Sequence, residues 1–344
     1  MIQGHGDDTH DYPRIRSNFS SNIYPYADLT GLKAHLCGKM DLIDRYPEPE
    51  PRSLEKVIAR KHGISSENVL VTNGATDAIY LIAQTAAKNY FTHFNTGPLP
   101  TFSEYEDASL MFGLTQIDDF GKTKVSGNTV LWLCNPNNPT GDTYSKAALA
   151  DFVQKHDLIV IDQSYEEYTV LPMMTHQEAA ESQNIIQLHS LTKTYAIPGL
   201  RLGYVIAPHH IIAKLRENVR PWSVNALAIE ACKWLLENDV SVVNDLHAYL
   251  SETQHLRTML NQIPGIRADE TQTNFFLVEM AAYKAADLKD YLVRKHHILI
   301  RDASNFRGLT PRHFRVSTQT PDENLLLANA IREFMHSVIH VSNL

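Results

Sequence analysis

The alternation of short apolar runs with helical patterns between residues 68 and 206 constrains the fold of this 344-residue chain most. Runs rich in Val, Ile and Leu are typical of buried strands, and the segments between them carry the apolar spacing of helices. Strands that alternate with helices in this way build a mostly parallel sheet with helices on both faces. The sequence therefore predicts an α/β fold with strands at 69–71, 129–134, 158–161, 185–188 and 204–206.

The pattern changes after residue 225. A helical pattern runs to about residue 236 and resumes over 242–260, and strand-like segments return at 274–278 and 298–301. The first 30 residues are rich in Asp, Pro, Ser and Tyr and have no helical period, as expected of an arm that packs elsewhere. We expect an N-terminal arm over 1–30 that joins the small domain, a large domain over 31–235 and a small α+β domain over 236–344.

Composition restricts the classes of function. The formal net charge of −8 argues against a nucleic-acid or anionic-membrane surface, because no basic stripe is available to displace counterions. The three cysteines, Cys37, Cys134 and Cys232, form no Cys-x-x-Cys pair, so neither a disulfide framework nor a zinc site is indicated. The sequence shows neither a leader pattern nor a membrane-spanning apolar stretch. We expect a cytoplasmic protein with no bound metal.

The first predicted strand runs directly into a helix. The sequence VLVTNGATD at 69–77 places Gly74 where the helical pattern starts, and no Gly-x-Gly-x-x-Gly fingerprint of dinucleotide-binding folds follows the strand. Free backbone N–H groups and the positive end of a helix meet at such a junction, which suits a phosphate. The alternative is a plain strand-to-helix turn capped by Thr72 or Asn73.

Two further strand ends carry polar residues. The sequence NPNNPTG at 135–141 places a polar loop where open α/β sheets bind ligands, although most such turns bind nothing. Asp162 ends an all-aliphatic strand, and Tyr165 follows three residues later. A desolvated carboxylate at this position needs a cationic partner or hydrogen bonds. The alternative for Asp162 is a helix cap or a structural salt bridge.

A lysine, Lys193, lies among small hydroxyl residues in the sequence SLTKTYAIPGLRLGY at 190–204. A partly desolvated lysine near other cations loses its proton more readily and becomes a nucleophile toward aldehydes. The alternative is a solvated surface lysine, the usual fate of this residue type.

Taken together, these groups match pyridoxal 5'-phosphate, a cofactor with a phosphate, a ring nitrogen, a phenolic oxygen and an aldehyde. The predicted partners are the helix end, Ser190 and Arg201 for the phosphate, Asp162 for the ring nitrogen, Asn138 and Tyr165 for the phenolic oxygen, and Lys193, as a Schiff base, for the aldehyde.

The three motifs NPNNPTG, D-x-x-Y and SLTKTYAIPGLRLGY, in this order, resemble those of the class I/II aminotransferases of pyridoxal-phosphate fold type I. The resemblance covers nearly the whole chain. It implies a large domain with a mostly parallel seven-stranded sheet covered by helices, a smaller α+β domain, and a homodimer that shares its active sites. Lys193, Asp162 and Tyr165 are then the candidate catalytic residues. The resemblance further implies that Gly74, Ala75 and Thr76 bind the phosphate, that Thr192 keeps the hydroxyl of a common serine, that Tyr105 stacks on the ring, that Arg315 binds the substrate carboxylate, and that Tyr46 reaches the phosphate of the neighbouring subunit.

Two branches of that family are most similar to the chain. These are the histidinol-phosphate aminotransferases and the threonine-phosphate decarboxylases of cobalamin synthesis. The segments GHGD at 4–7, NFSSNIYP at 18–25 and ILIRDASNFRGL at 298–309 favour the decarboxylases. The candidate substrate-binding residues are Arg315, Arg301, Asn22 and His5.

Arginine suits this task because its guanidinium binds carboxylates and phosphates through paired hydrogen bonds. His5 has the alternative of a mobile terminal histidine, and Arg301 that of a surface ion pair. The predicted reaction is decarboxylation of L-threonine O-3-phosphate. The alternative is amino transfer from histidinol phosphate to 2-oxoglutarate. A degenerate scaffold without enzymatic activity is not expected, because Lys193 and Asp162 are both present.

Overall fold

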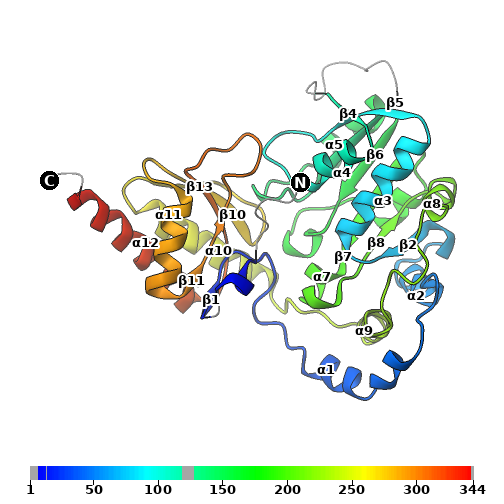
Figure 1. Cartoon of the computed structure of the whole chain (residues 1–344), viewed down its shortest axis with the longest axis horizontal. Coiled ribbons are helices and arrows are strands. Elements are labelled where there is room, and N and C mark those ends of the chain that lie inside the picture. Colours follow the sequence, from blue (N-terminus) through cyan, green and yellow to red (C-terminus); the bar gives the residue numbers. More distant parts are fainter. Residues whose placement is uncertain (1–6, 13, 118–127, 342–344) are drawn as a thin grey trace.

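The computed structural model describes residues 7–12, 14–117 and 128–341. Its largest sheet has seven strands in the order β2-β8-β7-β6-β5-β3-β4 (Figure 1). Strand β8 runs antiparallel to both of its neighbours, and all other pairs are parallel. The predicted mostly parallel seven-stranded sheet is thus confirmed. The strands are β2 (Val69–Thr72), β3 (Phe91–Asn95), β4 (Thr115–Gln116), β5 (Asn128–Cys134), β6 (Leu158–Asp162), β7 (Ile185–Ser190) and β8 (Gly203–Ile206).

Helices cover both faces of this sheet. Successive strand residues point to opposite faces, so Val69 and Leu131 belong to one hydrophobic core, and Leu70 and Val130 to another. Because both faces are buried, the strands appear in the sequence as continuous apolar runs. The first core includes α1 (Thr30–Cys37), α2 (Arg52–His62), α5 (Lys146–Lys155), α6 (His176–Ala180), α7 (Leu191–Thr194) and α9 (Ala226–Glu237); the second includes α3 (Ala75–Lys88), α4 (Glu104–Met111) and α8 (His209–Arg216).

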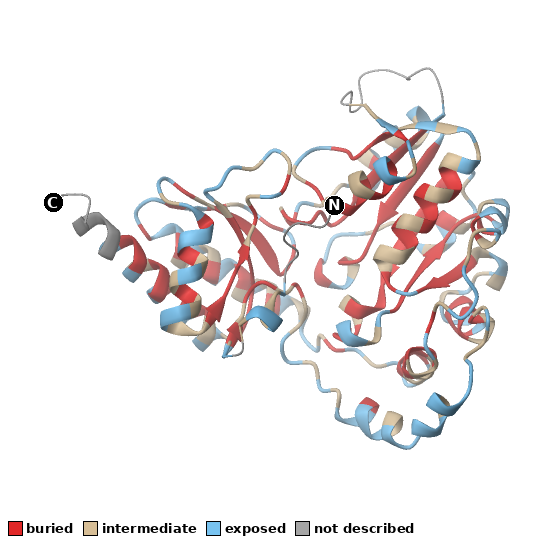
Figure 2. Cartoon of the chain, viewed as in Figure 1, coloured by how far each residue is buried: buried red, intermediate tan, exposed pale blue. Residues whose placement is uncertain are grey.

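A second, antiparallel sheet has four strands in the order β12-β13-β10-β9. Helices α10 (Leu246–Asn261), α11 (Ala285–Tyr291) and α12 (Pro321–Val341) pack with it around a separate core, visible as a second group of buried segments in Figure 2. Helix α10 begins four residues later than predicted, because the Asp245 side chain caps it by accepting from the N–H of Ala248 at 2.9 Å. The strands are β9 (Ile266–Ala268), β10 (Phe275–Met280), β12 (Arg301–Asp302) and β13 (His313–Ser317).

The N-terminal arm packs on the part of the chain that holds this second sheet. Strand β1 (Ser17–Asn18) pairs in parallel with β11 (Ile298–Leu299), and Phe19 is fully buried in the core of the four-stranded sheet. The arm is therefore fixed at its middle by backbone pairing and a buried ring. The domain boundaries at residues 30 and 235 stay a prediction.

Two strands of the large sheet, β3 and β4, are absent from the sequence prediction. Only the last two residues of β3 are buried, and β4 has two residues, so neither presents a long apolar run. Within the described residues, no helix combines the length and apolar character needed to cross a lipid bilayer.

Candidate active site

The polar residues predicted from the sequence gather where β5, β6 and β7 end. These strands are neighbours and parallel, so their carboxyl ends meet at one edge of the sheet. A cavity of about 410 Å³ opens there and extends to β13 of the second sheet and to the arm. Twelve predicted residues line it: Asn22, Ala75, Thr76, Tyr105, Asn138, Asp162, Tyr165, Ser190, Thr192, Lys193, Arg201 and Arg315.

The start of α3 lies at one end of this cavity. Gly74 precedes the helix with φ of 89°, and no side chain caps the first N–H groups of the helix. A Cβ atom at Gly74 would lie 2.8 Å from Nη2 of Arg201, so the guanidinium lies directly beside the helix start. The hydroxyl groups of Ser190 and Thr192 lie 2.8 Å apart and line the same cavity. A positive helix end, a guanidinium and two hydroxyl groups together suit a phosphate.

Asp162 places a carboxylate at the end of β6. Its side chain accepts hydrogen bonds from the Tyr105 hydroxyl at 2.7 Å and from the N–H and hydroxyl of Ser164 at 2.9 and 2.5 Å. Burial raises the pKa of Asp162, and the hydrogen bonds from Ser164 and Tyr105 oppose that rise. The carboxylate is thus preorganised by three donors and can accept a further one, such as a protonated ring nitrogen.

Lys193 lies in α7, just after β7, with its Nζ 5.9 Å from the centre of the Tyr165 ring. Burial and the positive charge of Arg315 lower the pKa of Lys193 to about 8, against the opposing charge of Asp7. Among the described residues, no carboxylate forms an ion pair with its ammonium group. An amine with this pKa is partly neutral near pH 8, and the neutral form attacks aldehydes.

Two buried arginines lie directly opposite each other on adjacent strands of the second sheet. Arg301 on β12 is paired in register with Arg315 on β13, and their side chains are 7% and 5% exposed. Arg315 donates to Oδ1 of Asn138 and to the carbonyl of Ser20 at 2.7 Å, whereas Arg301 donates to Oδ1 of Asn305 at 2.8 Å. In the described part of the chain, neither guanidinium forms an ion pair with a carboxylate. Like charges directly opposite each other destabilise a sheet, so an anion bound there would relieve the repulsion.

A buried phenol and amide lie beside the lysine. The amide nitrogen Nδ2 of Asn22 donates to the hydroxyl of Tyr165 at 3.4 Å, and burial raises the pKa of Tyr165 to about 12. The Tyr165 hydroxyl is therefore protonated at neutral pH. The Oδ1 atom of Asn22 is buried and accepts no hydrogen bond from the described residues. An unsatisfied buried acceptor costs free energy, so a ligand with a donor group is expected to complete it.

Comparison with known proteins identifies the family of this chain. The family model described as aminotransferase class I and II matches residues 15–331. The chain belongs to the aminotransferase class I and II family. The predicted family and its α/β fold are both confirmed.

Three members are representative of the similarity. The structure of L-threonine-O-3-phosphate decarboxylase from Porphyromonas gingivalis is 32% identical with a TM-score of 0.88, and the match covers 93% of this chain and 100% of that chain. The histidinol-phosphate aminotransferase of Thermoanaerobacter sp. (strain X514) is 28% identical, with 86% of each chain covered. The histidinol-phosphate aminotransferase of Sinorhizobium meliloti, solved in complex with pyridoxal-5'-phosphate, shares the fold at 17% identity and a TM-score of 0.82, covering 96% of this chain and 94% of that chain.

Three described residues of the aminotransferase-family prediction do not line the cavity. Gly74 lies beside Arg201 without lining the cavity, and Arg301 lies one strand away from Arg315. Tyr46 is 84% exposed and packs against the Trp222 ring at 5.5 Å, outside this chain's own cavity. His5 lies outside the described residues.

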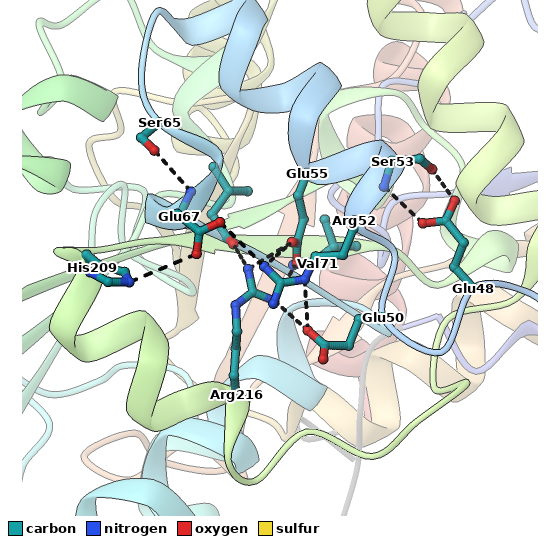
Figure 3. A network of polar contacts seen from close by, with 11 residues as sticks. Glu48, Glu50, Arg52, Ser53, Glu55, Ser65, Glu67, Val71, His209 and Arg216 are labelled. Carbon is teal, nitrogen blue, oxygen red and sulfur yellow. Dashed lines mark hydrogen bonds and ion pairs between the residues drawn. The ribbon is translucent and has the colours of Figure 1, made fainter.

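The segment that carries Tyr46 is anchored by a charged network (Figure 3). Glu50 accepts from Arg216 at 2.8 Å, and Arg216 also donates to the buried carboxylate of Glu55 at 2.8 Å. Glu55 in turn accepts from the N–H of Val71 at 3.2 Å. Because Val71 lies in β2, the network connects the Tyr46 segment to the strand that leads directly to α3.

Tyr105 makes contacts that sequence analysis did not predict. It is fully buried, its ring stacks on Trp132 at 5.4 Å, and its hydroxyl donates to Asp162. Phe102, three residues earlier, packs edge-on against Tyr105 at 5.6 Å and lines the cavity. Stacking of Tyr105 on a cofactor ring stays a prediction, and Phe102 is a second aromatic candidate that sequence analysis missed. Phe102 and Tyr105 both lie in the sequence PTFSEY at 100–105, which does not indicate which of the two rings would stack on a cofactor.

Asp7 is a second missed residue. It lines the cavity, its N–H donates to the hydroxyl of Ser20 at 3.1 Å, and its carboxylate accepts from Asn18 at 2.7 Å. Its negative charge raises the pKa of Lys193. The only signal in the sequence is its place at the end of the GHGD segment.

Proposed function

We propose that the cavity binds pyridoxal 5'-phosphate and that Lys193 forms the covalent bond to its aldehyde. The donor set supports this proposal, because an uncapped helix start, a buried carboxylate and a lysine of lowered pKa lie at the ends of different strands of one sheet. When bound, this cofactor supplies an aldehyde that bonds to amines and a ring that takes up electrons from the α-carbon of the substrate.

Each group of the cofactor has a partner of suitable chemistry in the cavity. The start of α3 with Ser190, Thr192 and Arg201 would hold the phosphate. Asp162, whose side chain accepts hydrogen bonds from Ser164 and Tyr105, would hold the ring nitrogen in its protonated form. Asn138 and Tyr165 would donate to the phenolic oxygen.

We further propose that the substrate is L-threonine O-3-phosphate and that the reaction removes its carboxylate. The observation that carries this proposal is the pair of buried arginines, Arg301 and Arg315, which lie opposite each other in register and form no ion pair with a carboxylate among the described residues. A substrate with both a phosphate and a carboxylate offers two anionic groups to two guanidinium groups. The 32% identity to the P. gingivalis L-threonine-O-3-phosphate decarboxylase supports the same choice.

The arginine on β12 is oriented by its own motif. Arg301 donates to Asn305 at 2.8 Å, and its guanidinium lies 5.4 Å from the centre of the Phe306 ring. These two contacts come from the Arg-Asp-x-x-Asn-Phe sequence that favours the decarboxylase branch. The motif therefore acts as a local support that fixes one guanidinium against a strand end.

Lys193 would have a second role whenever its amine is not bonded to the cofactor. Its Nζ can then hold the proton that the α-carbon receives in decarboxylation, or move the α-hydrogen in amino transfer. The arginines would decide between the two reactions by fixing the orientation of the substrate in the cavity. Arginines that hold the phosphate and leave the carboxylate free to depart would favour decarboxylation.

Amino transfer from histidinol phosphate to 2-oxoglutarate is the second candidate. The 28% identity to the Thermoanaerobacter histidinol-phosphate aminotransferase favours it. In that reaction the two arginines would bind the phosphate of one substrate and the carboxylates of the other in turn. The two candidates differ in whether carbon dioxide or glutamate is formed.

We also propose that two chains form a dimer in which each Tyr46 completes the phosphate site of the other chain. An 84% exposed tyrosine beside the 52% exposed Trp222, on a segment fixed by the Glu50–Arg216 contact, supports this arrangement. Large exposed aromatic side chains of this kind are typical of protein interfaces.

The purified protein, reconstituted with pyridoxal 5'-phosphate, tests the proposed reaction. It is incubated with O-phospho-L-threonine and, separately, with histidinol phosphate and 2-oxoglutarate. We expect carbon dioxide from the first incubation and no glutamate from the second. Glutamate from the second with no carbon dioxide from the first would replace the decarboxylase proposal with the aminotransferase.

A further inference from the structure

A buried acid–base pair lies just behind the cavity. Glu166, at the start of the short 3₁₀ helix η4 (Glu166–Tyr168), accepts a hydrogen bond from Nδ1 of His189 on β7 at 2.7 Å. The two side chains are 17% and 2% exposed, and neither residue lines the cavity. Burial opposes ionisation of Glu166, but His189, His176 and Gln163 together bring its pKa below its ordinary value. Glu166 is therefore a carboxylate, and Nδ1 of His189 must carry the proton that it accepts.

The pair connects the two segments that carry the reactive groups. Glu166 directly follows Tyr165, and His189 lies four residues before Lys193. The other end of η4 is tied to the same segment, because the hydroxyl of Tyr168 donates to the backbone carbonyl of Lys193 at 2.8 Å. In Figure 1, α7 continues directly from β7, so both ties act on the strand and helix that carry the lysine.

The histidine belongs to a stack of rings. His189 stacks between Tyr204 and His176, with centroids 4.6 Å away on each side, and His62 stacks on His176 at 3.7 Å. Burial lowers the pKa of His62 to about 4 and that of His176 to about 3, so both are neutral at physiological pH. Glu166 contacts this stack through its hydrogen bond with His189.

The stack does not present a preformed metal site. Ligand atoms of Glu166, His176 and His189 lie within 4.8 Å of one another. The two imidazole planes, however, are within 10° of parallel with centroids 4.6 Å apart. A histidine binds a metal through a lone pair that lies in its ring plane, so two stacked parallel rings cannot both direct that lone pair at one ion. The arrangement instead suits a hydrogen bond whose geometry is fixed by stacking on both sides.

We propose that Glu166 and His189 are positioning residues that hold the Lys193 segment against the Tyr165 turn, so that the amine of Lys193 is aimed into the cavity. This inference rests on the proposed function of Lys193 as the group that bonds to the cofactor. The hydrogen bond between Nδ1 and the carboxylate transmits the effect, and the Tyr168 hydroxyl is the second tie of the same clamp. A buried, charge-assisted hydrogen bond is among the stronger polar contacts in a protein.

Two substitutions of His189 separate the hydrogen bond from the ring stacking. His189→Asn keeps an N–H donor near the position of Nδ1 and removes the ring, whereas His189→Phe keeps a stacking ring and removes the donor. The readout is the rate at which the apoprotein captures pyridoxal 5'-phosphate, followed by the absorbance of the lysine-bound cofactor. We expect His189→Phe to slow capture roughly tenfold or more and His189→Asn to stay within about threefold of the wild type.

A role in packing alone predicts the reverse order, with the phenylalanine variant near wild type and the asparagine variant slow, and that order would overturn the inference. Wild-type rates in both variants would overturn it as well. Tyr168→Phe removes only the second tie and provides an independent check if His189→Phe does not fold, as judged by circular dichroism. A wild-type rate in Tyr168→Phe would then contradict the clamp.

Failure of the underlying function is distinguishable from failure of the inference. If the wild-type apoprotein captures no cofactor, or if Lys193→Ala shows the same absorbance as the wild type, the proposed role of Lys193 is wrong. If the wild type captures the cofactor through Lys193 and the order of the His189 variants is reversed, only the positioning role is wrong.

Discussion

Burial changes the pKa values of single charged residues in the cavity. Lys193 and Arg315 both have lowered pKa values because burial disfavours their charged forms, and each also repels another cation. The sequence could predict Lys193 and Asp162 because each follows an apolar run that ends at one edge of the sheet. It could not predict the contact between Arg315 and Asn138, which joins residues 177 positions apart and depends on how the two sheets face each other.

The pKa of Lys193 determines the pH dependence of cofactor capture. The neutral amine attacks the aldehyde, so the capture rate of the apoprotein is expected to rise with pH through a midpoint near 8. Arg315→Met removes a positive charge that lowers this pKa, so the midpoint should move upward, toward the ordinary value of 10.5. Asp7→Asn removes a negative charge that raises the pKa, so the midpoint should move downward. Stopped-flow absorbance at a series of pH values measures both shifts, and shifts in the same direction would contradict the assignment.

Gly74 is expected to be required for phosphate binding. Gly74→Ala introduces a Cβ atom 2.8 Å from Nη2 of Arg201 at a backbone φ of 89°, so the guanidinium must move away from the helix start. We expect the dissociation constant for pyridoxal 5'-phosphate to rise roughly tenfold or more, measured by equilibrium titration of the apoprotein.

Gly63→Ala is the matched control for this substitution. Gly63 also has a positive φ, of 67°, but its Cβ position has no atom within 4 Å, and it ends α2 away from the cavity. This variant should lose about 1 kcal/mol of stability and bind the cofactor as the wild type does. Equal losses of affinity in both variants would show that backbone strain, rather than the Arg201 contact, is responsible.

At the scale of secondary-structure elements, the sequence predicted those with a strong apolar signal. The strands β2, β5, β6, β7 and β8 are all confirmed, because both faces of the sheet are covered and each strand is a run of buried residues. Strand β3 was missed, because exposed and buried residues are mixed along it. The contact between η4 and β7 could not be predicted, since Glu166 and His189 are separate polar residues until two neighbouring strands bring them together.

The charged network at α2 and α8 is expected to be important for stability. Arg216→Met leaves the fully buried carboxylate of Glu55 without its main partner, and breaking such a pair costs about 3–5 kcal/mol. Arg52 lies 3.6 Å from the same carboxylate but is 41% exposed, so Arg52→Met should cost less than about 1 kcal/mol. Urea unfolding of the two variants measures the difference in the free energy of unfolding. Similar costs would show that Arg216 is not the partner that compensates for the burial of Glu55.

At the scale of the whole molecule, the cavity is assembled from three parts of the chain. The large sheet supplies the groups proposed to bind the cofactor, the second sheet supplies Arg315, and the arm supplies Asn22 and Asp7. The arm is fixed by the pairing of β1 with β11, so the same part of the chain that carries the arginines also positions these arm residues. A dimer would add Tyr46 as a contribution from a second chain.

Mixing two inactive variants tests whether active sites are shared. Lys193→Ala and Tyr46→Ala chains should each be impaired, the first by loss of the amine and the second by loss of the phosphate donor in trans. A mixed dimer has one doubly damaged site and one intact site. Refolding an equal mixture should therefore restore roughly a quarter of wild-type activity, the fraction expected for random pairing. A mixture that regains no activity, although cross-linking shows mixed dimers, would contradict the proposed role of Tyr46.

The central claim, decarboxylation of a phosphorylated amino acid by Lys193 and its neighbours, is tested most directly by NMR of the reaction with carboxyl-¹³C-labelled O-phospho-L-threonine in deuterated water. We expect the label to leave as carbon dioxide and bicarbonate, while one deuteron appears on the former α-carbon of an amino-propanol phosphate. Retention of the label in a keto acid would contradict the account. So would a protein that leaves O-phospho-L-threonine unchanged but converts histidinol phosphate.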